Sequence, residues 1–304
     1  SAGTLQIGAS GRLGGGSYAG NLTNNAAFIY SGTNNQTLSG IISGTGALTQ
    51  NNSSSTLTLS GNNTYTGATT INAGTIEIGA AGRLGGGSYS GNIANSGTLI
   101  YSGTNNQTLS GIISGIGALT QNAASTLTLS GANTYSGATT ISAGTLTIGG
   151  AGQLGSGSYS GSIANSGTFI YASSANQTLS GIISGTGALT MNGASTLTLT
   201  GTSTFNGSTT ISAGKLVVNG SAANSAVTIG SGATLAGSGT VGAVTVQSGG
   251  FIAPGNSPGN INVSTLTLAG GGGYNLELAN VSGTAGVDWD FITVGSGSGA
   301  ATIT

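Results

Sequence analysis

The amino-acid sequence predicts an all-β fold, a right-handed, single-stranded parallel β-helix or β-solenoid. Three observations predict it. One segment recurs at a fixed interval, short runs alternate apolar and polar residues, and 61 glycines, together with Asn, Ser and Thr, separate those runs. No window shows the apolar period of an amphipathic helix, which excludes helix as a major component.

The recurring segment reads LTLSGNNTYTGATTINAGTIEIG at residues 57–79. It returns at residues 127–149 and, in a divergent form, at residues 197–219. Its Ala-Gly pair recurs at Ala2, Ala73, Ala143 and Ala213, an almost constant interval of about 70 residues. A coil of a parallel β-helix needs three strands and three turns, so we expect each unit to supply about three coils of about 23 residues.

Apolar/polar alternation predicts the strands of the first unit. They are Thr4–Ile7, Ala27–Ser31, Gln36–Ile42, Ala47–Gln50, Thr56–Ser60 and Thr69–Ile78. An antiparallel sandwich and a propeller are the alternatives. Propeller blades would repeat about every 40–50 residues with Trp or Asp signatures, and the chain has a single tryptophan, Trp289.

Beyond residue 212 the long unit stops, and the intervals shorten to about 17–20 residues per coil. Strands are expected at Val227–Ile229, Val244–Val246, Phe251–Ala253, Ile261–Val263 and Leu266–Leu268, and residues 300–304 look like a further strand. We therefore predict two domains. Residues 1–212 hold three β-helix units of about 70 residues, and residues 213–304 form a continuing, narrower β-helix.

The composition excludes several classes of protein. Three basic and four acidic side chains give a net charge of −1, which provides no electrostatic surface for nucleic acid or an anionic membrane. The chain has no cysteine, so a disulfide scaffold is excluded. No apolar run is long enough to span a membrane as a helix. Residues 1–5 match the middle of a repeat, so we expect the chain to be a piece of something longer.

Aromatic residues recur at the repeat interval. Three positions repeat in this way, at Tyr18, Tyr89 and Tyr159, at Tyr30, Tyr101 and Tyr171, and at Phe28, Leu99 and Phe169. We expect these side chains to fill the core, because a leucine replaces phenylalanine within one set. The alternative is a surface platform on which glycans stack.

Residues 127–149, LTLSGANTYSGATTISAGTLTIG, resemble the autotransporter-associated β-strand repeat, or passenger-associated-transport repeat, of bacterial passenger domains. Residues 235–263, through GSGTV and APGNSPG, are similar to that family too, and YNLEL and DWDFITV resemble its strands near the translocator. The resemblance implies a secreted β-helical passenger, exported across the outer membrane of a diderm bacterium through a C-terminal β-barrel. It implies an extracellular or outer-membrane-surface location.

The residues needed for catalysis are scarce. Nucleophilic catalysis requires a base beside a hydroxyl or thiol, and the chain has no His or Cys and one lysine, Lys215. Glycoside cleavage requires paired carboxylates. Asp288 and Asp290 would share one strand face, but Glu77 and Glu277 are expected to lie far from them. We predict no catalytic residue, no cofactor and no enzymatic activity, with a β-helical polysaccharide lyase or hydrolase as the alternative.

Binding sites are equally sparse. Asp288 and Asp290 are weak candidates for calcium, and we otherwise predict no metal site. Thr-X-Thr pairs such as Thr56/Thr58 are typical of ice-binding surfaces but recur too rarely for a continuous array. Glycine runs lack the Lys-Ser/Thr that a phosphate loop requires.

The sequence thus favours a structural, cell-surface β-helical rod that acts in self-association, filament formation or adhesion. The partner we expect is another copy, joined head to tail through open strand edges. A surface glycan or receptor is the further possibility, and nucleic acid and a membrane-spanning segment are not expected.

Overall fold

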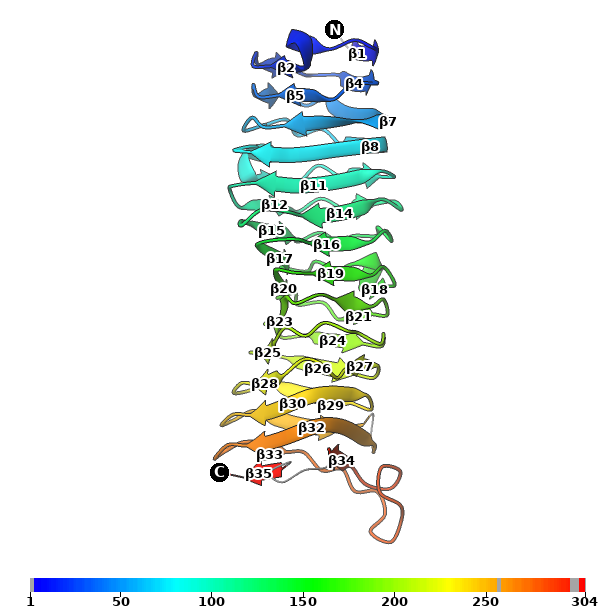
Figure 1. The fold of residues 1–304 in the computed structure, drawn as a ribbon, viewed down its shortest axis with the longest axis vertical. Helices are drawn as coiled ribbons and strands as arrows, with labels where there is room; N and C mark the ends of the chain where they lie inside the picture. The colour runs from blue at the N-terminus through cyan, green and yellow to red at the C-terminus, as the bar shows by residue number, and fades with distance from the viewer. Residues whose placement is uncertain (1–2, 256–257, 296–300, 304) are drawn as a thin grey trace. The chain divides into compact units, whose positions relative to one another are not determined.

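The computed structural model describes residues 3–255, 258–295 and 301–303, the last three by their backbone alone. They form two compact units, Ser1–Ser156 and Gly157–Thr304. Each unit is a stack of coils made of parallel strands (Figure 1), which confirms the predicted all-β, parallel β-solenoid. The described residues contain no α-helix, only three short 3-10 turns: η1 (Leu13–Gly16), η2 (Gly85–Gly87) and η3 (Gly155–Gly157).

The first unit contains the strands from β1 to β17. They are β1 (Thr4–Ala9), β2 (Ser17–Tyr18), β3 (Leu22–Thr23), β4 (Ala27–Gly32), β5 (Gln36–Leu38), β6 (Ile42–Ser43), β7 (Ala47–Leu59), β8 (Thr69–Ala80), β9 (Ser88–Tyr89), β10 (Ile93–Asn95), β11 (Thr98–Gly103), β12 (Gln107–Leu109), β13 (Ile113–Ser114), β14 (Ala118–Gln121), β15 (Thr126–Leu129), β16 (Thr139–Ile141) and β17 (Thr145–Ile148).

The second unit contains the strands from β18 onward. They are β18 (Ser158–Tyr159), β19 (Ile163–Asn165), β20 (Thr168–Tyr171), β21 (Gln177–Leu179), β22 (Ile183–Ser184), β23 (Ala188–Met191), β24 (Thr196–Leu199), β25 (Thr209–Ile211), β26 (Lys215–Val218), β27 (Ser221–Ala222), β28 (Val227–Ile229), β29 (Thr234–Gly237), β30 (Thr240–Val246), β31 (Phe251–Pro254), β32 (Asn260–Leu268), β33 (Gly273–Tyr274), β34 (Phe291–Val294) and β35 (Ala301–Ile303).

Most predicted strands lie within observed ones, with one interruption. The expected strand over residues 36–42 is broken into β5 and β6. Gly40 lies at the corner between them, where a Cβ would stand 2.2 Å from the carbonyl oxygen of Gly20. The chain turns there because glycine lets the corner of one coil rest on the corner of the coil before it.

Columns of stacked residues show how the coils of the first unit follow one another. Leu5 pairs with Phe28, Phe28 with Leu48, and Leu48 with Thr69, so three turns return to the same side of the stack. The repeat equivalent of Leu5 is Ile76, which lies beyond Thr69 in β8 and already around the next corner. One repeat therefore covers three turns and part of a fourth, which confirms and refines the expected three coils.

Successive repeats consequently occupy different sides of the coil. Ile76 pairs with Leu57, which lies in the same strand as Leu48 but on the adjoining side. The third equivalent, Leu146, pairs with Leu127 in the column of β9, β12, β15 and β17. The steps from Leu57 to Ile76 and from Leu127 to Leu146 are both shorter than the uniform coil of about 23 residues that we expected.

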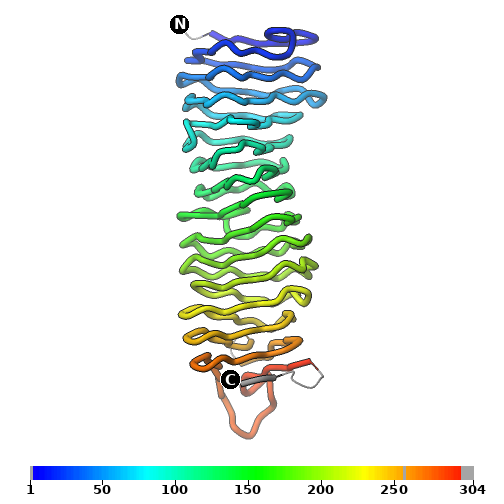
Figure 2. The backbone as a smooth tube through the Cα atoms, turned by 60° about the vertical axis from the view of Figure 1, so that its left-hand side comes forward, coloured from blue at the N-terminus to red at the C-terminus, as the bar shows by residue number. Residues whose placement is uncertain are grey.

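Coil length also varies in the second unit. The step between register partners is slightly shorter from Val227 to Val244 than from Thr209 to Val227, and it lengthens again from Val244 to Leu266. The division into compact units falls after residue 156, whereas the domain boundary expected at residue 212 stays a prediction. The tube in Figure 2 shows the coils of each unit as regularly spaced layers.

The inward side chains form the core, and the recurring aromatic residues belong to it. Two of the three tyrosines at the first repeated position, Tyr89 and Tyr159, are 1% exposed, and Tyr18 is partly exposed. The other two sets are buried throughout. The core prediction is confirmed. The alternative, a glycan-stacking platform on these rings, is wrong because the rings face the interior.

The sequence analysis missed a further buried aromatic position, at Tyr65, Tyr135 and Phe205. The rings of Tyr65 and Tyr89 pack edge to face with centroids 5.5 Å apart, and both hydroxyls hydrogen-bond Thr69 Oγ1 at 2.8 Å. Burial raises the pKa of Tyr65 well above its usual value. The hydroxyls therefore stay protonated, and both form a hydrogen bond with Thr69 inside the coil.

Buried amides satisfy the backbone where it turns. Asn133 is 0% exposed; its Oδ1 accepts the amide of Ile113 at 2.8 Å, and its Nδ2 donates to the carbonyls of Gly131 at 2.8 Å and Gln153 at 3.1 Å. Serine takes this position in the third repeat, where Ser203 Oγ accepts the amide of Ile183 at 3.1 Å. The hydrogen bond to the buried amide is thus kept in both.

We predict that Asn133→Ala lowers the free energy of unfolding by about 1–3 kcal/mol, because the buried amide of Ile113 loses its acceptor. Asn133→Ser, which copies the third repeat, should lower it by less than half as much. Urea unfolding followed by circular dichroism measures both. Equal losses in the two variants would contradict this role for the asparagine.

A column of glycines crosses the second unit. At Gly181, Gly201, Gly220 and Gly239, a Cβ would stand 2.1–2.5 Å from the carbonyl oxygen of the glycine one coil earlier. Backbone cannot yield at that distance, so any side chain would separate the coils.

Gly220→Ala should therefore destabilise the second unit by about 1–3 kcal/mol, as overpacking does. Gly8→Ala is the matched control, because Gly8 has no atom within 4 Å of its missing Cβ. It should leave the thermal unfolding midpoint unchanged or raise it. The expectation fails if Gly220→Ala unfolds at the same temperature as the parent protein.

Candidate functional site

One segment of the second unit leaves the coil pattern. Residues 275–290 follow β33, project from the stack and return at β34 (Figures 1 and 2). The segment closes on itself, because Leu278 and Trp289 form an antiparallel bridge and the amide of Gly286 donates to the carbonyl of Trp289 at 2.7 Å. It has no counterpart in the repeats.

Asp290 attaches this segment to the coils. Its Oδ1 accepts the amide of Gly259 and its Oδ2 accepts the amide of Glu277, each at 2.9 Å. Its own amide donates to the Glu277 carbonyl at 2.9 Å, and the Tyr274 hydroxyl donates to its carbonyl at 2.9 Å. The side chain is 3% exposed. Burial, and then the charge of Asp290, raises the pKa of Tyr274.

Asp288 forms its hydrogen bonds within the projecting segment. Its Oδ2 accepts the amide of Thr284 at 2.6 Å, and its carbonyl accepts the amide of Ala279 at 2.7 Å, so it closes the turn inside the segment. The expectation that Asp288 and Asp290 share one strand face is wrong. Both precede β34, and each carboxylate is directed at a different part of the backbone because the chain is turning there.

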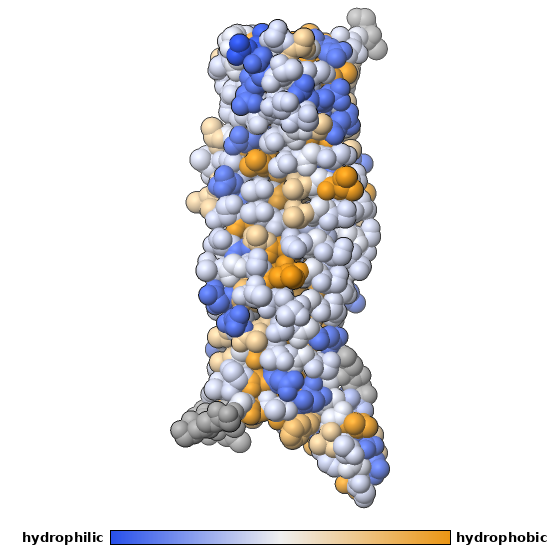
Figure 3. Space-filling view, turned by 45° about the vertical axis from the view of Figure 1, so that its right-hand side comes forward, coloured by the Kyte–Doolittle hydropathy of each residue, from blue (hydrophilic) through white to orange (hydrophobic). Residues whose placement is uncertain are grey.

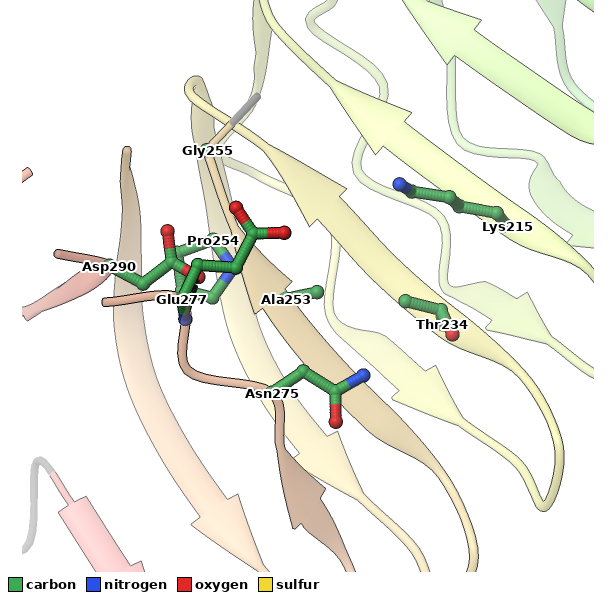
Figure 4. A pocket seen from close by; sticks show the side chains of 8 residues that line it. All are labelled: Lys215, Thr234, Ala253, Pro254, Gly255, Asn275, Glu277 and Asp290. Carbon is green, nitrogen blue, oxygen red and sulfur yellow. Dashed lines mark hydrogen bonds between the residues drawn. The ribbon is translucent and has the colours of Figure 1, made fainter. Parts of the chain in front are cut away.

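A pocket lies between the projecting segment and the outer face of the coils (Figure 4). Lys215, Thr234 and Ala253 come from β26, β29 and β31, and Pro254 and Gly255 close one end. The segment contributes Asn275, Glu277 and Asp290. The pocket has a volume of about 440 Å³.

The pocket gathers three of the seven charged side chains of the protein. The expectation that Glu277 lies far from Asp290 is wrong, because the segment folds back and joins them through two hydrogen bonds. In Figure 4 the ammonium group of Lys215 and the carboxylate of Glu277 are on opposite sides of the pocket, and no ion pair links these two described residues.

The carboxylates of the pocket are not equivalent. Both oxygens of Asp290 already accept backbone N–H groups in a buried position, whereas Glu277 is exposed and its carboxylate is available. A pair of free carboxylates, which glycoside hydrolysis requires, is not offered here. Within residues 3–255 and 258–295 no group of three or more His, Cys, Asp or Glu side chains could hold a metal ion. The absence of a metal site, with Asp288 and Asp290 as weak candidates, stays a prediction.

The sequence contains one signal for this pocket. Lys215 occupies the repeat position held by Thr4, Thr75 and Thr145, so the only lysine replaces a threonine in the copy nearest the projecting segment. The sequence analysis did not place Glu277 near Lys215, because Glu277 lies far along the chain in a stretch without repeats.

Comparison with protein families finds one match. The model of the passenger-associated-transport repeat matches residues 52–78, 119–148 and 184–218. The chain carries three passenger-associated-transport repeats. No curated protein and no solved structure matches it.

The predicted resemblance is thereby confirmed, and the matched residues have a structural meaning. Each passenger-associated-transport repeat contains a buried polar side chain at one equivalent position, Asn63, Asn133 or Ser203, and one buried ring, at Tyr65, Tyr135 or Phe205. The family pattern therefore records how one coil is filled and how its turns are satisfied. In the parts of the chain that the structure describes, no helix has the length and hydrophobicity to cross a membrane.

The pocket lies mostly outside the repeats. Lys215 is in the last matched segment, and the remaining lining residues follow it. The side chains that could recognise a ligand are thus concentrated where the repeat pattern ends.

We predict that Asp290→Ala releases residues 275–290, because hydrogen bonds to charged groups contribute about 1.5–3 kcal/mol each. Limited proteolysis should cut this segment at least tenfold faster, and the amides of Gly259 and Glu277 should exchange faster with solvent. Asp288→Asn is the control, since it alters only the turn inside the segment. Unchanged exchange at both amides in Asp290→Ala would rule out the attachment.

Proposed function

We propose that this chain is a structural β-helical rod of an autotransporter-like passenger and that it acts by self-association. The observation that carries the proposal is that the repeated residues lie mostly in the core. Most of the repeated aromatic, aliphatic and amide side chains serve core packing and backbone hydrogen bonds. The repeated isoleucines Ile41 and Ile112 are exposed, and no charged side chain lies next to them in the sequence. The repeat family implies a secreted or outer-membrane-surface location in a diderm bacterium.

The surface supports association between copies. Charged residues make up 2% of the chain, and the face in Figure 3 is mostly of intermediate hydropathy, with scattered hydrophilic and hydrophobic groups. Low net charge reduces the repulsion that keeps proteins apart. We propose no catalytic role, because the pocket offers a single free carboxylate and the chain has no histidine or cysteine.

Head-to-tail contact is the form of association that we propose. Among the described residues, β1 pairs only on the side of β4, and the carbonyls of Gly3 and Ala9 accept from the next coil. Successive residues of a strand direct their N–H and C=O groups to opposite sides, so those of Gln6 point away from β4. In the 304-residue chain such an edge can add the terminal strands of another copy, and a contact of this kind extends into a filament.

The test is sedimentation velocity and electron microscopy of the 304-residue chain. We expect concentration-dependent species larger than a monomer, and filaments one coil stack wide. Gln6→Pro removes the outward N–H and should shift the material to monomer, while Gln6→Thr, which keeps that N–H, should not. Monomers alone at micromolar concentration, or filaments unaffected by Gln6→Pro, would overturn the proposed contact.

A further inference from the structure

We propose that the pocket lined by Lys215, Asn275 and Glu277 binds a neutral saccharide, one hexopyranose unit at a time. The proposal goes beyond a structural role and does not rest on self-association. Its starting point is the rarity of charge. A chain with three basic and four acidic side chains places three of the seven around one pocket.

The charged groups of the pocket are left free for a ligand. Lys215 and Glu277 are exposed and form no ion pair with one another. The two carboxylate oxygens of Asp290 already accept backbone N–H groups. Because Asp290 is 3% exposed, the charges that a ligand can touch are one positive, on Lys215, and one negative, on Glu277. A neutral ligand that both donates and accepts hydrogen bonds can use both of them.

The polar groups suit vicinal hydroxyls. The Lys215 ammonium donates, the Glu277 carboxylate accepts, and the amide of Asn275 and the hydroxyl of Thr234 do both. Sugar hydroxyls also donate and accept at once, so each can bridge a donor and an acceptor of this set. Hydrogen bonds to charged partners are the stronger ones, which makes Lys215 and Glu277 the residues on which binding depends.

The same surface offers apolar contact. Ala253 and Pro254 line the pocket. Phe251 pairs with Thr234 in the outward column of this face and remains 37% exposed. Its ring lies over Gly273, where a Cβ would stand 2.5 Å from the ring. Phe251 does not line the pocket itself. Apolar groups beside a few convergent polar groups are the usual composition of a ligand site, and Ala253 and Pro254 could contact the C–H face of a pyranose.

The site is also held in place. Lys215, Thr234 and Ala253 stand on neighbouring paired strands, and Asp290 fixes the backbone of Glu277. Rigid elements with supporting hydrogen bonds keep such a constellation in register. Asp290 is thus a positioning residue for Glu277.

Saturation-transfer NMR of the 304-residue chain tests the proposal, with the methyl glycosides of glucose, galactose, mannose and N-acetylglucosamine as probes. We expect transfer to at least one glycoside. Lys215→Thr restores the residue of the other repeats and should weaken binding about tenfold, the effect of losing one strong hydrogen bond. Glu277→Gln should weaken it to a similar degree.

Two controls make the result decisive. Arg83→Gln removes another rare charge and copies Gln153 of the next repeat, so it should leave binding unchanged. The dipeptide Ala-Ala, a zwitterion, serves as the competing probe. No transfer to any glycoside, equal transfer in Lys215→Thr, or transfer to the dipeptide alone would overturn the proposal. Circular dichroism should show that Lys215→Thr unfolds at the temperature of the parent chain.

Discussion

The structure depends on the contact of one coil with the next through backbone. Parallel strands in register place neighbouring coils about 4.8 Å apart, and at the corners that distance leaves no room for a Cβ. The glycines at the turns meet this requirement, as at Gly220, where the added carbon would stand 2.2 Å from the carbonyl oxygen of Gly201. The high glycine content is therefore a packing requirement of the solenoid, and the conformational freedom of these glycines is lost on stacking.

This constraint explains the choice of buried polar residues. Turns that stack on turns hide amide groups from water, and each hidden amide needs a partner. Asn133 supplies three hydrogen bonds from a fully buried site, and Ser203 supplies the one that the amide of Ile183 needs. Gln121, by contrast, has a buried Oε1 without a partner, and Met191 holds the equivalent position in the third repeat. The Nε2 of Gln121 donates to the carbonyls of Ala123 at 2.9 Å and Ser125 at 2.8 Å, so this position stabilises its turn through donors alone.

Much of the fold could be predicted because repetition makes local signals redundant. Alternation in residues 57–59 and 76–78 predicts strands twice over, and the Phe28/Leu99 exchange places that position in the core. The side of the coil on which each repeat lies could not be predicted, because coil length varies from turn to turn and only the register reveals it. The pocket could not be predicted for a related reason. Asp290 joins Glu277 to the coils through backbone amides, and backbone pairing in a segment without repeats has no sequence pattern.

Successive repeats start on different sides of the coil, so residues that repeat in the sequence do not line up on one side of the surface. Ile41 and Ile112 are repeat equivalents and each is 39% exposed. Ile41 precedes β6, which lies in a two-stranded sheet with β3, whereas Ile112 precedes β13, which lies in the sheet that contains β4, β7 and β8. Equivalent surface residues therefore lie on different sides and do not form a continuous stripe. Adding repeats lengthens the solenoid without building a repeated binding face. Recognition chemistry must then come from positions that depart from the repeat, and Lys215, which replaces a threonine beside the projecting segment, is such a position.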